Sequence, residues 1–318
     1  MKNKNIVFIR FLAIVLVMLG HSIIIYSNDW NIYTTANQSE FLNEIKQVIN
    51  IIQMPIWFCI SGFLFYSSTK KNDFRKLLKN KVYRLLIPFV IIGLSYLFPI
   101  RYIIKYKNYI QHSLIYNIIV NLIIGKDNGH LWYLPTLFFT FIFSYFFLKI
   151  KEKIKINDYI YIILIAVVGV FGTRIPLYLG NMFRYLVYFN IGYIMNKNKI
   201  KIKNKYLIIS ILLLPLITML PQFNIANTVI LNNIFAITFC IALFSCDFKL
   251  DNKVVNYISN NSYALYLLHS PLVYITYTYF PNIHPIYMIG INFIGFGLVC
   301  IIINEIVKKT KIKFVLGH

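Results

Sequence analysis

Apolar runs long enough to cross a bilayer recur from one end of the chain to the other. A helix needs about 20 apolar residues to span the hydrocarbon layer. Short stretches rich in Lys, Asn and Tyr separate the runs. The pattern predicts an all-α, polytopic membrane protein, a bundle of ten transmembrane helices in a single integral domain over residues 1–318. The predicted spans are 6–27, 47–67, 85–104, 130–148, 158–172, 177–195, 206–221, 228–246, 257–278 and 285–307.

Composition and charge support the membrane class and orient the chain. Of its 318 residues, 58% are hydrophobic and 13% are charged, whereas about a quarter are charged in a soluble domain. The net charge of +22 would favour a nucleic-acid partner in a soluble protein. Here, however, 25 of the 32 Lys and Arg fall in segments on one side of the predicted spans. Because cytoplasmic loops are enriched in Lys and Arg, we expect a multi-pass cell-membrane protein with both termini cytoplasmic and no nucleic-acid partner. The basic segments are 1–10, 68–84, 149–157, 196–205, 247–253 and 308–313.

The four cysteines all lie in apolar spans and lack metal-ligand spacing. Buried, inert thiols are the expected state of such residues. We therefore expect no metal site. As a separate expectation, no cofactor is bound. The cysteines are Cys59, Cys240, Cys246 and Cys300.

Arg10 and His21 both lie within the first apolar run. Eleven residues of helix make about three turns and roughly 16 Å of rise, so the two side chains share nearly one face. Charged or titratable groups inside a span usually face the protein interior or a wet cavity. Arg10 alone is explained by snorkelling to the cytoplasmic surface. His21 lies deeper, where it either makes a hydrogen bond within the bundle or acts as a general base or acyl acceptor.

A second candidate is the basic loop that precedes Pro88. Arg75, Lys81 and Arg84 lie in it, and the last two are three residues apart on one helical face. Such cations either set the topology and attract anionic lipid, or bind the phosphate oxygens of a ligand. Spacing alone supports the two interpretations equally.

Two further motifs combine aromatic residues with histidine. His130 and Trp132 begin the fourth predicted span; Trp132 is typical of an aromatic belt, while His130 has the chemistry to hydrogen-bond a sugar hydroxyl or water. Ser262, Tyr266 and His269 recur at helical spacing and form one polar stripe. Such stripes usually make interhelical hydrogen bonds, and a substrate-binding role is the alternative.

In their order along the chain, these motifs resemble the acyltransferase-3 family of membrane acyltransferases. They are Arg10-x10-His21, Met54-Pro-Ile-Trp-Phe-Cys-Ile-Ser-Gly-Phe-Leu, Lys81-x-x-Arg84-Leu-x-Ile-Pro88, His130-Leu-Trp-Tyr-Leu and Ser262-Tyr-x-x-Tyr-Leu-x-His269. The resemblance covers essentially the whole chain. It implies a ten-helix bundle that transfers an acyl group from cytoplasmic acyl-CoA to a glycan hydroxyl.

The resemblance also assigns residues. Arg10 and His21 match the family's essential Arg/His motif, and Lys81 and Arg84 match its RxxR motif. Lys81 replaces the first Arg, which keeps the charge but loses the bidentate fork. We expect no additional soluble domain, so acceptor recognition would rest on short outer loops.

The resemblance therefore implies an O-acyltransferase that moves an acyl group to a cell-surface or lipid-linked glycan, a polysaccharide modification. It also favours acetyl, from acetyl-CoA, as the acyl group. The protein's predicted partners are acyl-CoA, the glycan and membrane lipid. Direct transfer and transfer through an acyl-enzyme both stay open, as does the acceptor. The alternative is a transporter or exporter of glycan intermediates, although no internal repeat of the kind common in transporters is visible. The predicted catalytic residues are His21 and Arg10, and the predicted binding residues are Arg75, Lys81, Arg84, His130, Trp132, Tyr266 and His269.

Overall fold

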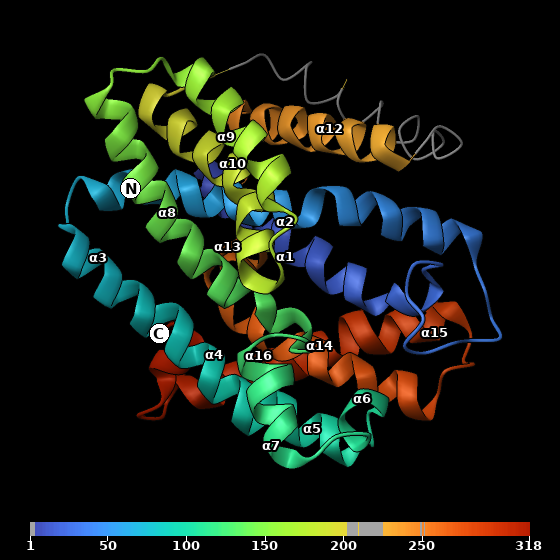
Figure 1. The fold of residues 1–318 in the computed structure, drawn as a ribbon. Helices are drawn as coiled ribbons and strands as arrows, with labels where there is room; N and C mark the ends of the chain where they lie inside the picture. Colours follow the sequence, from blue (N-terminus) through green and yellow to red (C-terminus); the bar gives the residue numbers. More distant parts are fainter. Residues whose placement is uncertain (1–3, 202–208, 210–224, 249, 251) are drawn as a thin grey trace. The chain divides into compact units, whose positions relative to one another are not determined.

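The fold is built from helices, and no strand occurs among the residues that the structure describes (Figure 1). In this computed structural model the described residues are 4–201, 209, 225–248, 250 and 252–318. The helices are α1 (Lys4–Ser22), α2 (Glu40–Thr69), α3 (Phe74–Lys81), α4 (Ile87–Ile92), α5 (Phe98–Ile103), α6 (Lys107–Ile110), α7 (Leu114–Tyr116), α8 (Tyr133–Lys153), α9 (Asp158–Gly172), α10 (Leu177–Asn198), α12 (Ile225–Ser245), α13 (Lys253–Asn260), α14 (Ser262–Tyr279), α15 (Pro285–Ile289) and α16 (Phe296–Lys308).

Five helical segments in the described part of the chain are long and apolar enough to cross a membrane. Each overlaps one of the predicted spans, and two of them, Glu40–Thr69 and Phe74–Ile103, begin earlier than predicted. Four more predicted spans are helical, as α9, α10, α12 and the α13–α14 pair, and the predicted span 206–221 lies outside the described residues. The number of crossings and the cytoplasmic termini stay predictions. The five segments are Lys4–Ser22, Glu40–Thr69, Phe74–Ile103, Gly129–Lys153 and Pro285–Lys308.

The prediction of a basic loop before Pro88 is wrong, because these residues are helical. Phe74–Ile103 forms one helical segment that contains Arg75, Lys81 and Arg84. Proline lacks the N–H of a helical turn and its ring crowds the preceding turn. A π-helical turn, Val82–Leu86, precedes Pro88 and accommodates it. The basic residues therefore belong to the first turns of a span.

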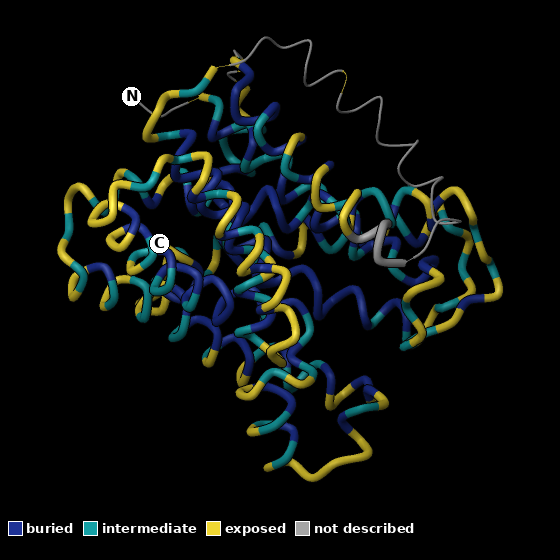
Figure 2. Tube along the Cα trace, turned by 45° about the horizontal axis from the view of Figure 1, so that its top comes forward, coloured by how far each residue is buried: buried dark blue, intermediate teal, exposed yellow. Residues whose placement is uncertain are grey.

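Several helices expose apolar side chains and bury polar or small ones, the reverse of a soluble protein. On α9 the exposed face includes Ile163 (62% exposed) and Val170 (68%), whereas Tyr161 and Gly169 are buried. Figure 2 shows the alternation of exposed and buried positions along the helices. Exposed apolar stripes of this size mark an interaction surface, and hydrocarbon lipid is the solvent that suits them.

The stretch 109–124 consists of short helical turns that show the same reversed pattern. Asn117 and Asn121 are buried, and Nδ2 of Asn121 donates to Oδ1 of Asn117 over 2.7 Å. Ile115 and Ile119 are exposed. Its polar side thus faces the protein interior.

The chain divides into two compact units, each assembled from separate segments. The first contains Met1–Ala13, Asn50–Asn80 and Thr136–Asn256, and the second contains Ile14–Ile49, Lys81–Pro135 and Tyr257–His318. A single integral domain stays a prediction.

In the first unit, α2 and α10 approach closely because both carry glycine at the crossing. A Cβ at Gly62 would lie 1.8 Å from the Phe189 carbonyl oxygen, and one at Gly192 would lie 2.0 Å from that of Cys59. Small residues that allow backbones to approach are typical of helix contacts in membranes.

All four cysteines are free and buried, as expected.

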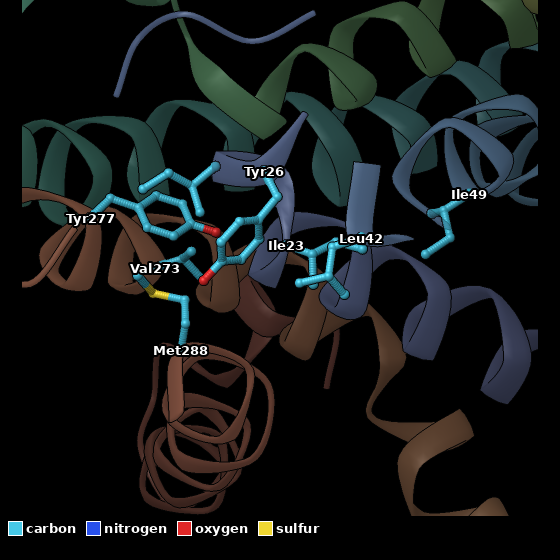
Figure 3. Packing of buried hydrophobic residues seen from close by; sticks show 8 residues of the cluster. Ile23, Tyr26, Leu42, Ile49, Val273, Tyr277 and Met288 are labelled. Carbon is cyan, nitrogen blue, oxygen red and sulfur yellow. The ribbon is translucent and has the colours of Figure 1, made fainter. Parts of the chain in front are cut away.

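In the second unit, a cluster of buried apolar residues packs beyond the end of α1 (Figure 3). It joins the segment after α1 to the first turns of α2, to α14 and to α15. Two of its members, Tyr26 and Tyr277, are almost fully buried tyrosines. α14 also packs beside α16 (Figure 1). The cluster consists of Ile23, Ile25, Tyr26, Leu42, Ile49, Val273, Tyr277 and Met288.

Candidate active site

Three histidines from distant parts of the sequence meet in the second unit. His21 lies in the last turn of α1, His130 in the short 3-10 turn Gly129–Trp132, and His269 in the middle of α14. The ring centroids of His21 and His269 are 5.0 Å apart, and those of His130 and His269 are 5.5 Å apart. Both pairs are arranged edge to face. His269 thus lies in ring contact with both of the other imidazoles.

The backbone of His21 is fixed by the end of its helix and by α14. Carbonyl groups in the last turn of a helix lack partners within the helix. The Tyr277 hydroxyl donates to the His21 carbonyl oxygen over 2.6 Å. The Ser22 hydroxyl donates to the Met18 carbonyl oxygen over 2.7 Å. These two hydrogen bonds hold the backbone at the end of α1, where the His21 side chain is half-buried.

The ring of His130 is oriented by the backbone of α14. Its Nε2 lies 3.0 Å from the Leu267 carbonyl oxygen. A carbonyl only accepts, so Nε2 carries the proton and Nδ1 of the neutral ring holds a lone pair. Within the described part of the chain, Nδ1 is buried without a hydrogen-bond partner. The Tyr266 hydroxyl donates to the His130 carbonyl oxygen, which fixes the turn.

His269 is oriented by carbonyl groups of its own helix. Its Nδ1 lies 3.0 Å from the Leu265 carbonyl oxygen and 2.9 Å from that of Tyr266. Both oxygens accept, so Nδ1 carries the proton. Nε2 then presents a lone pair, and among the described residues it too is buried without a partner. Unpartnered buried polar atoms are costly, and here two of them are nitrogens of imidazole rings that contact each other.

An ion pair supports the turn that carries His130. Nη1 of Arg101 lies 2.9 Å from Oδ1 of Asp127, and the arginine is 1% exposed. The guanidinium lies over the rings of Tyr106 and Tyr109, 4.4 and 5.1 Å from their centroids. Burial raises the pKa of both tyrosines and the Arg101 charge opposes that shift.

Gly129 is held directly against this arginine. It has φ +57°, in the left-handed region where glycine is at no disadvantage. A Cβ at Gly129 would lie 2.7 Å from Nη2 of Arg101. The residue before His130 therefore has two separate reasons to be glycine.

The other predicted site residues are distributed over the molecule. Tyr266 reaches the histidine cluster, and its ring contacts that of His130 with centroids 5.4 Å apart. Trp132 is half-buried and contacts Tyr133. Arg84 is exposed, but the Tyr263 hydroxyl of α14 donates to its carbonyl oxygen over 2.6 Å.

The remaining three predicted residues are basic. Lys81 belongs to the second unit, as the histidines do, whereas Arg10 and Arg75 belong to the first. Arg10 lies three turns before His21 on the same helix α1. Arg75 is exposed on α3. The roles of all these residues stay predictions.

Sequence reasoning missed Lys46 and the Arg101–Asp127 pair. Lys46 is 3% exposed and interacts electrostatically with His21. The sequence placed it just outside a span beginning at residue 47, whereas α2 begins at Glu40. A lysine at the edge of an apolar run was the available signal. Asp127 is 26 residues from Arg101, and no spacing rule links them.

The chemistry available here is that of neutral imidazoles. In the described part of the chain no carboxylate hydrogen-bonds to the three histidines, and no group of His, Cys, Asp or Glu is arranged to hold a metal ion. Two oriented lone pairs and one half-buried imidazole suit proton transfer or nucleophilic catalysis.

Fold and site together define a helical membrane protein with a histidine cluster inside its apolar segments. The chain belongs to the acyltransferase-3 family, because that family's model, described as an acyltransferase domain, matches residues 3–305. The resemblance drawn from its motifs is thereby confirmed. Neither the curated proteins nor the solved structures contain a significant match. Membership supports a membrane acyltransferase.

Proposed function

We propose that the protein is a membrane O-acyltransferase that moves an acetyl group from cytoplasmic acetyl-CoA to a hydroxyl of a cell-surface or lipid-linked glycan. The observation that carries this proposal is the cluster of His21, His130 and His269, in which two buried lone pairs have no partner among the described residues. A transfer of acyl groups to hydroxyls needs a base at the acceptor oxygen. Family membership supplies the reaction class.

Acyl-CoA is proposed to dock its phosphates on the basic turns that carry Arg75, Lys81 and Arg84. The contact between Tyr263 and the Arg84 carbonyl supports this route, because Tyr263 and His269 lie on the same helix. Six residues of α14 separate them, about 9 Å of rise. An extended pantetheine arm is long enough to cover such a distance, with Arg10 as a further cation along α1. His130, Trp132 and Tyr266 are proposed to border the acceptor and the acyl group.

At the reacting atoms, His21 removes the proton of the acceptor hydroxyl. The hydroxyl oxygen forms a bond to the thioester carbonyl carbon, the carbon–sulfur bond breaks, and the thiolate of CoA finally takes up the proton. In the variant with an acyl-enzyme, the His21 nitrogen attacks first and the acceptor then takes the acyl group from it. Positioning and exclusion of water supply much of the rate in either case.

The proposal is tested in inside-out membrane vesicles supplied with acetyl-CoA labelled in the acetyl group. Wild type is expected to release CoA and to label a membrane glycan. His21→Ala is expected to show no CoA release and no labelling above the level measured in vesicles without the protein. His112→Ala is the matched control, because His112 is an exposed histidine outside the cluster. Normal transfer by His21→Ala contradicts the assignment of His21. A wild type that neither turns over nor binds acyl-CoA contradicts the enzyme and favours a transporter.

A further inference from the structure

We infer that His269 is a positioning residue that accepts a proton from His21 during transfer, so that the base of this enzyme is a pair of imidazoles. The inference rests on the proposed function and adds a role for a residue that was assigned only to substrate binding. Three observations support it: the hydrogen bonds of His269, its ring contact with His21, and the hydrogen bonds that the neighbouring side chains already make.

The first step is the proton position on His269. Two carbonyl oxygens, of Leu265 and Tyr266, accept from Nδ1 at 3.0 and 2.9 Å. In the other tautomer the lone pair of Nδ1 would face these two acceptors, which is repulsive. The helix itself therefore holds the tautomer with a basic Nε2. In many enzymes a carboxylate or carbonyl fixes a catalytic histidine in the same way.

The second step is the contact with His21. The two rings lie edge to face at 64°, with centroids 5.0 Å apart. Nε2 of His269 is buried and has no partner in the described part of the chain. Once His21 takes a proton from the acceptor it carries an N–H on each ring nitrogen, and one of these can be donated to Nε2 of His269. Catalytic hydrogen bonds are often loose without substrate and tighten in the complex.

The third step considers the groups that surround the pair. His130 contacts His269 and Tyr266 through its ring, and its own Nε2–H is bound to Leu267. The Tyr266 hydroxyl donates to the His130 carbonyl. Lys46, on α2, interacts electrostatically with His21, and a charged ammonium does not accept a proton. His269 is thus the neighbour of His21 that has both contact and an oriented lone pair.

The proton balance is closed within the site. The acceptor hydroxyl gives its proton to one ring nitrogen of His21, and the opposite N–H of His21 passes a proton to Nε2 of His269. The acceptor oxygen bonds to the acyl carbon and the carbon–sulfur bond breaks. His269 then returns the proton through His21 to the thiolate, which leaves as CoA. No further reactant is needed.

The test compares two conservative variants in proteoliposomes. His269→Asn keeps an amide N–H for the Leu265 and Tyr266 carbonyls but offers no basic nitrogen, and His269→Gln places an amide near the Nε2 position. Both are expected to fold with the thermal midpoint of wild type. We expect kcat to fall about a hundredfold, with the KM for acetyl-CoA changed less than about twofold. His112→Asn is the control and should leave both constants unchanged.

A second measurement separates proton transfer from packing. In His269→Ala, added imidazoles of similar size and increasing basicity should restore turnover in order of their basicity. Rescue that follows size alone would overturn the inference, as would wild-type kcat in His269→Asn and His269→Gln. A raised KM at unchanged kcat would instead make His269 a binding residue. A silent wild type overturns the proposed function itself and the inference with it.

Discussion

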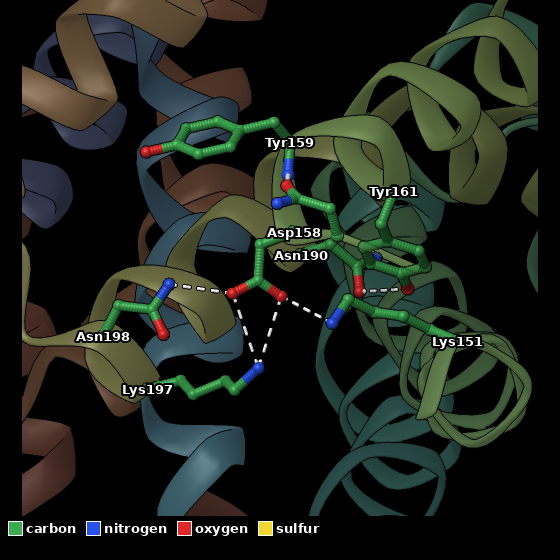
Figure 4. A network of polar contacts seen from close by, with 8 residues as sticks. Lys151, Asp158, Tyr159, Tyr161, Asn190, Lys197 and Asn198 are labelled. Atoms are coloured by element: carbon green, nitrogen blue, oxygen red, sulfur yellow. Dashed lines mark hydrogen bonds and ion pairs between the residues drawn. The ribbon is translucent and has the colours of Figure 1, made fainter. Parts of the chain in front are cut away.

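The polar network around Asp158 and the histidine cluster differ in how many of their polar groups have a hydrogen-bond partner. In the first unit, Asp158 accepts from Lys151 over 2.5 Å, from Asn198 over 2.8 Å and from Lys197 over 3.3 Å (Figure 4). Nearby, both ends of the Asn190 amide are used. In the histidine cluster, by contrast, the lone pairs of His130 and His269 have no partner among the described residues.

This difference indicates that the Asp158 network stabilises the fold, whereas the histidine cluster carries the chemistry. A polar network whose members are all paired rigidifies the helices that carry it. The Asp158 network joins the end of α8, the start of α9 and the end of α10. A buried group without a partner costs stability, and such strain concentrates where a ligand is to be bound. We therefore expect substitutions in the Asp158 network to lower stability and substitutions in the histidine cluster to lower turnover.

The largest loss of stability is expected for Asp158→Leu. It leaves the buried Lys151 without its closest acceptor and removes three contacts at a half-buried carboxylate, each worth about 1 kcal/mol. The thermal midpoint of the purified protein in detergent should fall, while CoA release per folded molecule stays that of wild type. Asp29→Leu, at an exposed carboxylate, should change the stability by less than about 0.5 kcal/mol. An unchanged thermal midpoint in Asp158→Leu would contradict the claim that the Asp158 network stabilises the fold.

Arg101→Met should lower both the stability and the turnover, because the ion pair of Arg101 with Asp127 supports the turn that carries His130. We expect a loss of about 3 kcal/mol in stability and roughly a tenfold loss of kcat from displaced groups. The two losses are measured on one preparation, by thermal unfolding and by CoA release. Arg174→Met, at an exposed arginine, is the control. If turnover per folded molecule survives intact, Arg101 has no influence on the site.

Tyr277→Phe should have a modest effect that falls on the site. It removes the hydrogen bond to the His21 carbonyl, worth about 1 kcal/mol, and leaves the ring packed in its cluster. We expect a small fall in the thermal midpoint and a few-fold fall in kcat. Tyr159→Phe, at a tyrosine that is 80% exposed, should show neither.

The smallest effect is expected for Lys81→Arg, which restores the bidentate fork of the family motif. A stronger phosphate contact of about 0.5 kcal/mol would lower the KM for acetyl-CoA roughly twofold without changing kcat. Initial rates over a range of acetyl-CoA concentrations measure it. A lower kcat at constant KM would place Lys81 outside donor binding.

Much of the site was predictable from sequence because its members follow helical spacing or carry unusual chemistry for an apolar run. His21, His130 and His269 were all selected in that way, and the five long spans were found from apolar length alone. The sequence did not predict which ring nitrogen of a histidine carries the proton, or which face of a helical segment is buried. The tautomer of His269 depends on carbonyl positions, and the inward polar face of residues 109–124 depends on tertiary packing.

Long-range pairs and helix starts account for most of the rest. No local pattern joins Arg101 to Asp127. Lys46 lay just beyond a predicted boundary, because apolar length alone does not reveal the polar first turns of α2. The basic residues before Pro88 were predicted to form a loop, because the apolar run begins only at residue 85, whereas the helix already begins at Phe74.

The most direct test of the account measures CoA release and the thermal midpoint on the same preparations of wild type, His21→Ala and Asp158→Leu. The account predicts that His21→Ala keeps the wild-type midpoint and loses at least about a hundredfold in CoA release. Asp158→Leu should show the reverse, a lowered midpoint with normal release per folded molecule. Wild-type CoA release from a well-folded His21→Ala protein would contradict the claim that the histidine cluster carries the chemistry.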